Sequence, residues 1–264
     1  LLVPMYAAQG EWRSVWWWVG LITVAMALLV LVVFKKGGLL KQTVQPALTP
    51  LATEKVVPSM RLELIKPWVL LIWSMNFLIG FATFPFQTYL SSYLRTELGF
   101  DVQFSAQVWA VIGFVGMFAG LAIGWLSDRT GLRAAMLLVY GCVVTAALIF
   151  VIHPSGHWPL IAAGLFSTAF YPIFGLIPAY VSKLASSSAM AVSIFGVANV
   201  MQGSGGMLGN YGAGLLANHS GSFAGIYAAI SAVGVLLIVL TLKLPREAPA
   251  ATPAGLTVNY PTVS

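Results

Sequence analysis

Seven long stretches of this chain contain no aspartate, glutamate, lysine or arginine. A helix crosses the roughly 30 Å hydrocarbon core of a bilayer with about 20 mostly apolar residues, and each stretch is about that long. A charged residue at the centre of such a helix costs roughly 2.5–3.5 kcal/mol, so the absence of charge favours lipid. The predicted spans are Val15–Phe34, Pro67–Tyr89, Ser105–Leu126, Ala134–Ile152, Trp158–Val181, Met190–Ala217 and Phe223–Leu242.

Composition argues against a soluble helical bundle. The chain is 59% hydrophobic and 8% charged, whereas soluble domains carry roughly 25% charged residues. A soluble bundle also needs a polar outward face on each helix, and residues Val19–Phe34 offer none. We therefore predict an all-α polytopic membrane protein.

Few residues are available for catalysis or metal binding. The chain has one cysteine, three histidines and seven acidic residues, and Cys142 lies inside an apolar run. Histidine can carry protons near neutral pH, but His153, His157 and His219 lie at the ends of the predicted spans, as interfacial loop residues do. The spans offer no paired carboxylates, metal ligands or activated nucleophile. We expect no enzyme activity, no metal site and no cofactor.

The net charge of +6 predicts topology and not an acidic partner. Basic residues fall between the apolar stretches and form no stripe, which argues against nucleic acid. If residues 35–66 are cytoplasmic, alternation places eleven lysines and arginines on that side and only Arg13 and Arg95 opposite. This bias predicts a multi-pass protein of the cell inner (plasma) membrane with a cytoplasmic C-terminus.

A polar turn, "GWLSDRTGLR" (Gly124–Arg133), separates two of the apolar stretches. Gly131 tolerates the positive φ that a tight reversal needs. We expect Asp128 to precede the next helix and accept hydrogen bonds from its free N–H groups. Arg129 and Arg133 would hold the turn at an anionic membrane surface. These residues alone would make a stable hairpin with positive anchors.

The same turn resembles the loop motif of the major facilitator superfamily, commonly Gly-x-x-x-Asp-Arg-x-Gly-Arg-Arg/Lys. The matching positions are Gly124, Asp128, Arg129, Gly131 and Arg133. Leu132 departs from the motif, replacing one of the basic pair. In that family the motif follows the second helix of each six-helix half, and here it follows the second span after the long polar segment. Two further segments, "GEWRSVWWWVG" and "GSGGMLGNYGAGLL", are similar to the start of the family's sixth helix and to its eleventh helix.

The resemblance implies a twelve-helix transporter, of which this chain holds seven transmembrane helices, six to twelve. Residues 1–34 would be the end of the N-terminal half, with Leu1–Ala8 as the outer end of helix five and 15–34 as helix six. The other parts would be a cytoplasmic central loop at 35–66, a C-terminal six-helix half at 67–242 and a disordered cytoplasmic tail at 243–264. The alternative, in which Pro67 begins the first half, is disfavoured by the long basic segment before it.

The resemblance also implies a role for the polar turn. In the family, the aspartate and arginine of the motif form a charge network at the gate between the two halves, and this network stabilises the outward-facing state. Asp128 and Arg129 would then belong to a conformational gate. The alternative is that the turn is only a hairpin.

Glycines recur at helical spacing on two of the spans. They are Gly116, Gly120 and Gly124 on one, and Gly205 and Gly209 on the other. Small residues at this spacing let helix backbones approach closely in lipid. Ordinary helix packing would explain them. The resemblance adds that these spans, the eighth and eleventh helices, pack against the opposite half and slide during transport.

Polar side chains align on several spans. One face carries Asn76, Gly80, Thr83 and Gln87, and another carries Asn199, Gln202, Gly206 and Asn210. Because unsatisfied amides are costly in hydrocarbon, these faces must point to other helices or to water. Interhelical hydrogen bonds would explain any single residue, whereas aligned faces fit a hydrated cavity, which the family's seventh and tenth helices line. The candidate substrate contacts are Trp73, Asn76, Gln87, Tyr171 and Asn199.

The function that the resemblance implies is secondary active transport of a small solute, by rigid-body rocking of two halves about a midplane site. The expected partners are a small-molecule solute, the lipid bilayer and the missing N-terminal half of the same protein. A coupling proton stays open, and nucleic acid is not expected. The alternative is a transporter-like membrane sensor or scaffold without flux.

Overall fold

The computed structural model describes residues 12–36, 64–152 and 154–245, and these ranges contain helices and no strand. The elements are α2 (Trp12–Lys36), α4 (Pro67–Ser92), the π-helical turn η1 (Tyr93–Glu97), α5 (Val102–Thr130), α6 (Leu132–Val151), α7 (Trp158–Leu184), α8 (Ser188–Ser220) and α9 (Ala224–Lys243). Each predicted span corresponds to one helix, with only Ile152 and Phe223 just outside, and the predicted fold class is confirmed. Leu1–Ala8, His153, most of the central loop and nearly all of the tail lie outside the described residues.

Polar caps set several helix ends beyond the apolar stretches. The Phe104 N–H donates to Asp101 Oδ1 at 2.7 Å, so α5 begins three residues before its predicted start. The Met190 N–H likewise donates to Ser187 Oγ at 3.2 Å at the start of α8. Both caps satisfy N–H groups that the first helical turn leaves free. Helices α5 and α8 are therefore longer than hydropathy alone predicts.

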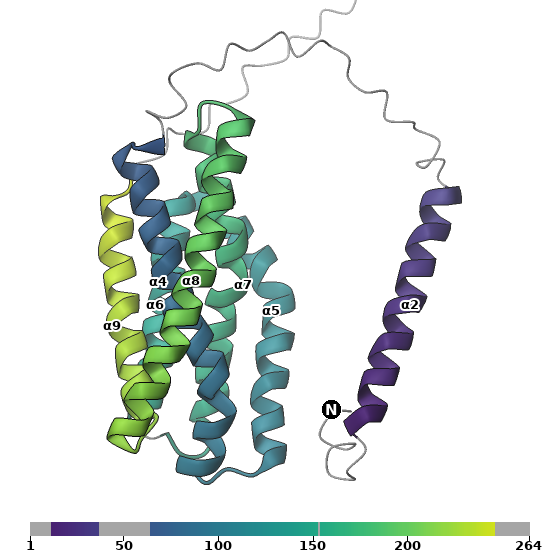
Figure 1. Ribbon diagram of the computed structural model, residues 1–264, viewed down its shortest axis with the longest axis vertical. Coiled ribbons are helices and arrows are strands. Elements are labelled where there is room, and N and C mark those ends of the chain that lie inside the picture. Colours follow the sequence, from purple (N-terminus) through teal and green to yellow (C-terminus); the bar gives the residue numbers. More distant parts are fainter. Residues whose placement is uncertain (1–11, 37–63, 153, 246–264) are drawn as a thin grey trace, which may run out of the picture.

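Six of the described helices are long and apolar enough to cross a membrane, and α8 is not among them. The sequence of α8 is diluted by glycine, serine and asparagine. Figure 1 nevertheless shows α8 running alongside α4 through the full length of the bundle. The position of α8 in the bundle is therefore explained by its packing against α4 and not by its hydropathy.

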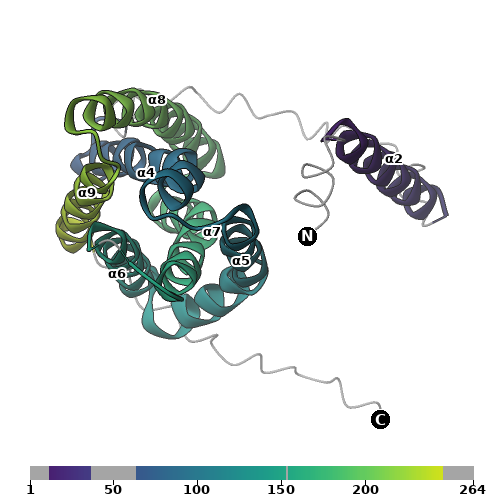
Figure 2. The same cartoon turned by 90° about the horizontal axis from the view of Figure 1, so that it is seen from below.

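Helices α4 to α9 form one bundle. Helix α4 packs against α8 and α9, α5 packs against α7, and α6 packs against both α7 and α9. Figures 1 and 2 show α2 standing apart from this bundle. The apolar side chains of α2 are exposed, with 82% of Trp17 accessible. Such a surface suits lipid or another apolar helix, because it has no polar face to offer water.

An aromatic cluster fills the centre of the bundle. Phe86 of α4 stacks on Phe166 of α7, with 3.8 Å between ring centroids and 2° between planes. Its ring also meets Phe150 of α6 and Tyr227 of α9 edge to face. The Phe86 side chain is fully buried. These contacts join four helices around one residue, which makes α4 the centre of the packing.

A glycine seam, defined by Gly80, Gly205, Gly206 and Gly209, joins α4 to α8. A Cβ atom added at Gly80 would lie 1.9 Å from the Gln202 carbonyl oxygen, and one at Gly205 would lie 1.9 Å from that of Phe77. One added at Gly209 would lie 2.4 Å from the Phe81 carbonyl oxygen. Only glycine permits such backbone approach, which is the packing mode that small residues allow in lipid.

Glu97 closes the end of the bundle opposite the Gly124–Arg133 turn. Its carboxylate accepts hydrogen bonds from the Ser222 hydroxyl and from the Phe223 N–H, each at 2.6 Å. Phe223 is the residue that precedes α9. A carboxylate at this position satisfies free N–H groups and complements the positive end of α9. Glu97 therefore ties the end of α4–η1 to the α8–α9 turn.

Replacing Glu97 by glutamine is expected to lower the free energy of unfolding by about 1–3 kcal/mol, because hydrogen bonds to a charged group are among the stronger ones. The amide keeps the shape but loses the charge, and its NH₂ group faces a donor. Denaturant unfolding in micelles measures the loss. The matched control is Arg95→Gln, which removes an exposed charge from the same turn. Equal losses in the two variants would contradict the capping role.

Candidate functional site

The Gly124–Arg133 turn reverses the chain within a single residue. Helix α5 runs to Thr130, Gly131 has φ +90°, and α6 starts at Leu132. The Gly131 N–H donates to the Ser127 carbonyl at 2.9 Å, which completes the last turn of α5. The positive φ expected at Gly131 is confirmed.

The prediction that Asp128 precedes the next helix and caps it is wrong. Asp128 lies in the last turn of α5 and is exposed, and no side chain caps α6. The reason is that α5 continues beyond its apolar stretch and Gly131 alone makes the reversal, so no residue is left to cap from. A carboxylate at a helix C-terminus faces the partial negative charge of the last carbonyls. Asp128 therefore does not stabilise the end of α5.

The two basic side chains of the turn, unlike that of Asp128, contact other described residues. The Arg129 guanidinium lies 3.7 Å above the centroid of the Trp125 ring, a cation–π contact. Arg133 donates to the Leu242 carbonyl at the end of α9 and so joins α6 to α9. Within the described part of the chain, Asp128 has neither a hydrogen bond nor an ion pair. Any ionic partner of Asp128 therefore lies outside the described residues.

Four of the five candidate substrate contacts bond to nearby backbone. Asn76, Gln87 and Asn199 each donate through the side-chain amide to the carbonyl four residues earlier, at 2.9, 3.5 and 3.1 Å. The Trp73 indole N–H donates to the Ile194 carbonyl of α8 at 3.0 Å. Asn76 is buried, Trp73 and Gln87 are half-buried, and Asn199 is exposed. Trp73 thus supports α4–α8 packing.

Tyr171, the fifth candidate, is 42% exposed. Its ring packs where Gly116 leaves room, since a Cβ atom at Gly116 would lie 2.2 Å from the Tyr171 ring. Among the described residues, no hydrogen bond or ring contact joins any two of the five candidates. The described contacts therefore do not link the five candidates directly to one another, and a shared solute site for them stays a prediction.

The glycines expected to pack helices divide into two groups. Gly205 and Gly209 lie against α4, and Gly116 lies against Tyr171 of α7, so all three pack within the bundle. Gly120 and Gly124 have open space where a side chain would be. The first group has the ordinary packing role, and the second faces away from the bundle's own helices.

Sequence reasoning missed several polar contacts between helices, of which two involve the C-terminal end of α4 and η1. One is the Glu97 cap on α9, and the other is the Tyr89 hydroxyl, which donates to the Asn210 carbonyl of α8 at 3.1 Å. The only sequence feature that could have indicated the Glu97 cap is the position of this acid just after a predicted span. No group of three or more potential metal-ligating side chains occurs in the ranges that the structure describes.

The bundle and its apolar helices together define an all-α polytopic membrane protein. The family model of the Major Facilitator Superfamily matches residues 1–210. The chain belongs to this superfamily and is a membrane transporter of that type. In a comparison with curated proteins, no match reaches significance.

Proposed function

We propose that the protein is a secondary active transporter that moves a small solute by alternating access. In this proposal, residues 67–242 form the C-terminal half and α2 is the last helix of the N-terminal half, most of which lies in other sequence. The helices then alternate across an inner membrane, with the Gly124–Arg133 turn and the C-terminus on the cytoplasmic side. The basic residues of that side support this orientation.

The observation that carries the proposal is the exposed Asp128, which has no partner among the described residues, on a helix that also exposes glycines. The exposed glycines are Gly113 and Gly120 on α5 and Gly196 and Gly203 on α8, where an added Cβ would meet nothing within 4 Å. Exposed small residues in lipid mark surfaces where another helix approaches. An exposed carboxylate with no local partner is suited to an ionic contact across the same interface. Both features fit a second half that docks and separates.

Tyr171 and Asn199 are the best placed of the candidate solute contacts, because both are exposed and come from different helices, α7 and α8. The amide of Asn199 uses its NH₂ group within α8, which leaves its oxygen as an acceptor for a solute. Asn76, by contrast, is buried among the bundle's own helices. A half-site of this kind supplies hydrogen bonds and a ring face, and the other half would complete it.

The test is uptake of labelled solutes into proteoliposomes. The complete transporter is expected to give saturable flux, whereas residues 1–264 alone are expected to give none, because half of the cavity wall is absent. A protein with an impaired fold would mimic the second result, so the chain's helicity is measured in the same liposomes by circular dichroism. Saturable flux by residues 1–264 would overturn the two-half proposal. Solute binding by the complete protein without flux would instead favour the sensor or scaffold alternative.

A further inference from the structure

A pocket of about 460 Å³ lies between the first turn of α4 and the last turn of α9. Its lining residues are Pro67, Trp68, Leu71, Lys243 and Pro245. The membrane span of α4 begins at Pro67 and that of α9 ends at Lys243. The pocket therefore sits where hydrocarbon gives way to the polar headgroup layer, at the same end of the bundle as the Gly124–Arg133 turn.

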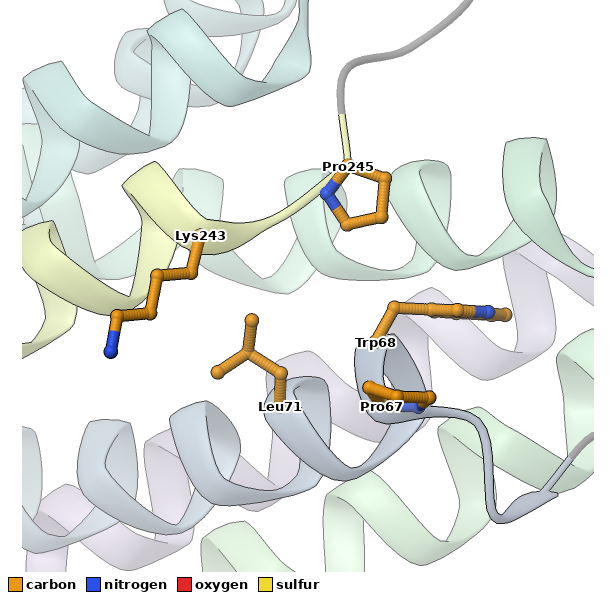
Figure 3. Close-up of a pocket in the computed structure, with 5 residues that line it drawn as sticks. All are labelled: Pro67, Trp68, Leu71, Lys243 and Pro245. Atoms are coloured by element: carbon orange, nitrogen blue, oxygen red, sulfur yellow. The ribbon is translucent and has the colours of Figure 1, made fainter.

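The walls of the pocket are apolar and its edge is cationic. Figure 3 shows Leu71 between the Lys243 side chain and the neighbouring Pro67 and Trp68 rings, with Pro245 above Trp68. In this view the ammonium group lies on the side away from Trp68. Tryptophan and lysine are the residues that proteins place at the membrane–water boundary, the ring in the boundary and the ammonium in the headgroups.

The described helix ends around the pocket carry basic residues. Neither α4 nor α9 contains an aspartate or glutamate. Lys66 directly precedes α4, and Arg133 reaches the Leu242 carbonyl beside Lys243. Within the described ranges, Lys243 takes part in no hydrogen bond or ion pair. Among the described residues, α4 and α9 thus offer a cation at this site and no anion of their own to neutralise it.

We propose that this pocket binds one anionic phospholipid, with its phosphate against Lys243 and the start of an acyl chain against Leu71 and Trp68. Exposed leucines flank the site, since Leu70 is 46% and Leu242 is 53% accessible, so its surroundings offer a lipid chain an apolar surface. A soluble anion would use the lysine but gain nothing from the apolar walls. A zwitterionic lipid would use the walls but bring a cation of its own toward Lys243. An anionic lipid satisfies both parts of the site.

The bound lipid would hold the ends of α4 and α9 together. These two ends contribute every lining residue, so the lipid would bridge two helices that enter the membrane far apart in the sequence. A ligand that binds only the folded state raises its stability. The proposal rests on the membrane fold alone and does not depend on the transport mechanism.

The experiment adds phosphatidylglycerol, phosphatidylcholine or inorganic phosphate to residues 1–264 in a neutral detergent. Native mass spectrometry reads the fraction of protein with one lipid bound, and thermal unfolding reads stability. Phosphatidylglycerol is expected to bind and to raise the unfolding temperature, whereas the other two are not. Lys243→Gln is expected to lower the bound fraction at least threefold. Lys183→Gln, which removes a lysine from the last turn of α7 at the same end, should leave it unchanged.

A second variant, Leu71→Trp, fills the apolar part of the pocket and keeps the charge. It is expected to abolish binding, and its unfolding temperature without lipid reports whether it folds. If Leu71→Trp does not fold, the proposal is tested by comparing the bound lipid fraction of Lys243→Gln with that of Lys183→Gln. Equal losses in that pair, or an equal response to phosphatidylcholine, would overturn the proposal. A response to inorganic phosphate alone would overturn the lipid as occupant and leave only an anion site.

Discussion

Replacing Gly205 by alanine is expected to lower the free energy of unfolding by roughly 1–3 kcal/mol, the usual cost of overpacking. The added methyl group would lie 1.9 Å from the Phe77 carbonyl oxygen, and that oxygen belongs to rigid helix backbone. Helices α4 and α8 must then move apart, which also opens the contacts at Gly80 and Gly209. The loss should fall near the upper end of this range. Denaturant unfolding of residues 1–264 in micelles measures it.

The matched control is Gly203→Ala, two residues earlier on the same helix. A Cβ atom there meets nothing within 4 Å. Alanine restricts the unfolded chain more than glycine, so this variant is expected to gain up to about 0.5–1 kcal/mol. The pair separates close packing from helix propensity, because the chemical change is the same. A gain of stability in Gly205→Ala would show that the seam tolerates side chains.

Asp128→Asn is expected to shift the proposed transporter toward its inward-facing state. The carboxylate has no partner in the described part of the chain, and the transport proposal places its ionic contact on the opposite half. Removing the charge weakens that contact and leaves the bundle intact. A cysteine at exposed Ser193, in the second turn of α8 and in a Cys142→Ser background, reports opening through its reaction with a membrane-impermeant maleimide. Its labelling is expected to accelerate severalfold.

Asp101→Asn provides the control for this effect, since Asp101 lies at the other end of α5. There the carboxylate caps the helix, and asparagine caps about equally well. Its labelling rate should therefore match that of the parent. The unfolding free energy of Asp128→Asn should not fall, because an acid at a helix C-terminus is locally unfavourable. Equal labelling of the two variants would contradict the gate proposal.

Hydropathy predicts the helices of this chain well and their ends poorly. All seven stretches are helical because uncharged apolar residues must satisfy their backbone within the segment in lipid. The ends depend on single polar residues: Asp101 and Ser187 start helices early, and α5 continues through Asp128 to Thr130. Charged residues are tolerated in a helix once it leaves the hydrocarbon. The apolar content of a stretch therefore cannot predict where the last turn of its helix ends.

The candidate site could be predicted only in part, because helical spacing gives a shared face without naming the partner. Asn76 and Gly80 do share a face of α4, but Asn76 is buried and Gly80 contacts the backbone of α8. An i, i+4 pattern is the same for a cavity wall and for a helix seam. Which one forms depends on the neighbouring helix. That neighbour is set by residues more than a hundred positions away.

The close fit between α4 and α8 has a consequence for how the protein is made. Insertion into a bilayer during synthesis depends on the hydrophobicity of each segment, and α8 is the one described helix that falls short of an apolar span. It is synthesised after α4, so the α4 surface around Gly80, which receives the α8 glycines, is made first. We expect α4 to serve as the receptor for α8. A substitution in the seam would then lower the yield of protein in cells before it affects any finished molecule.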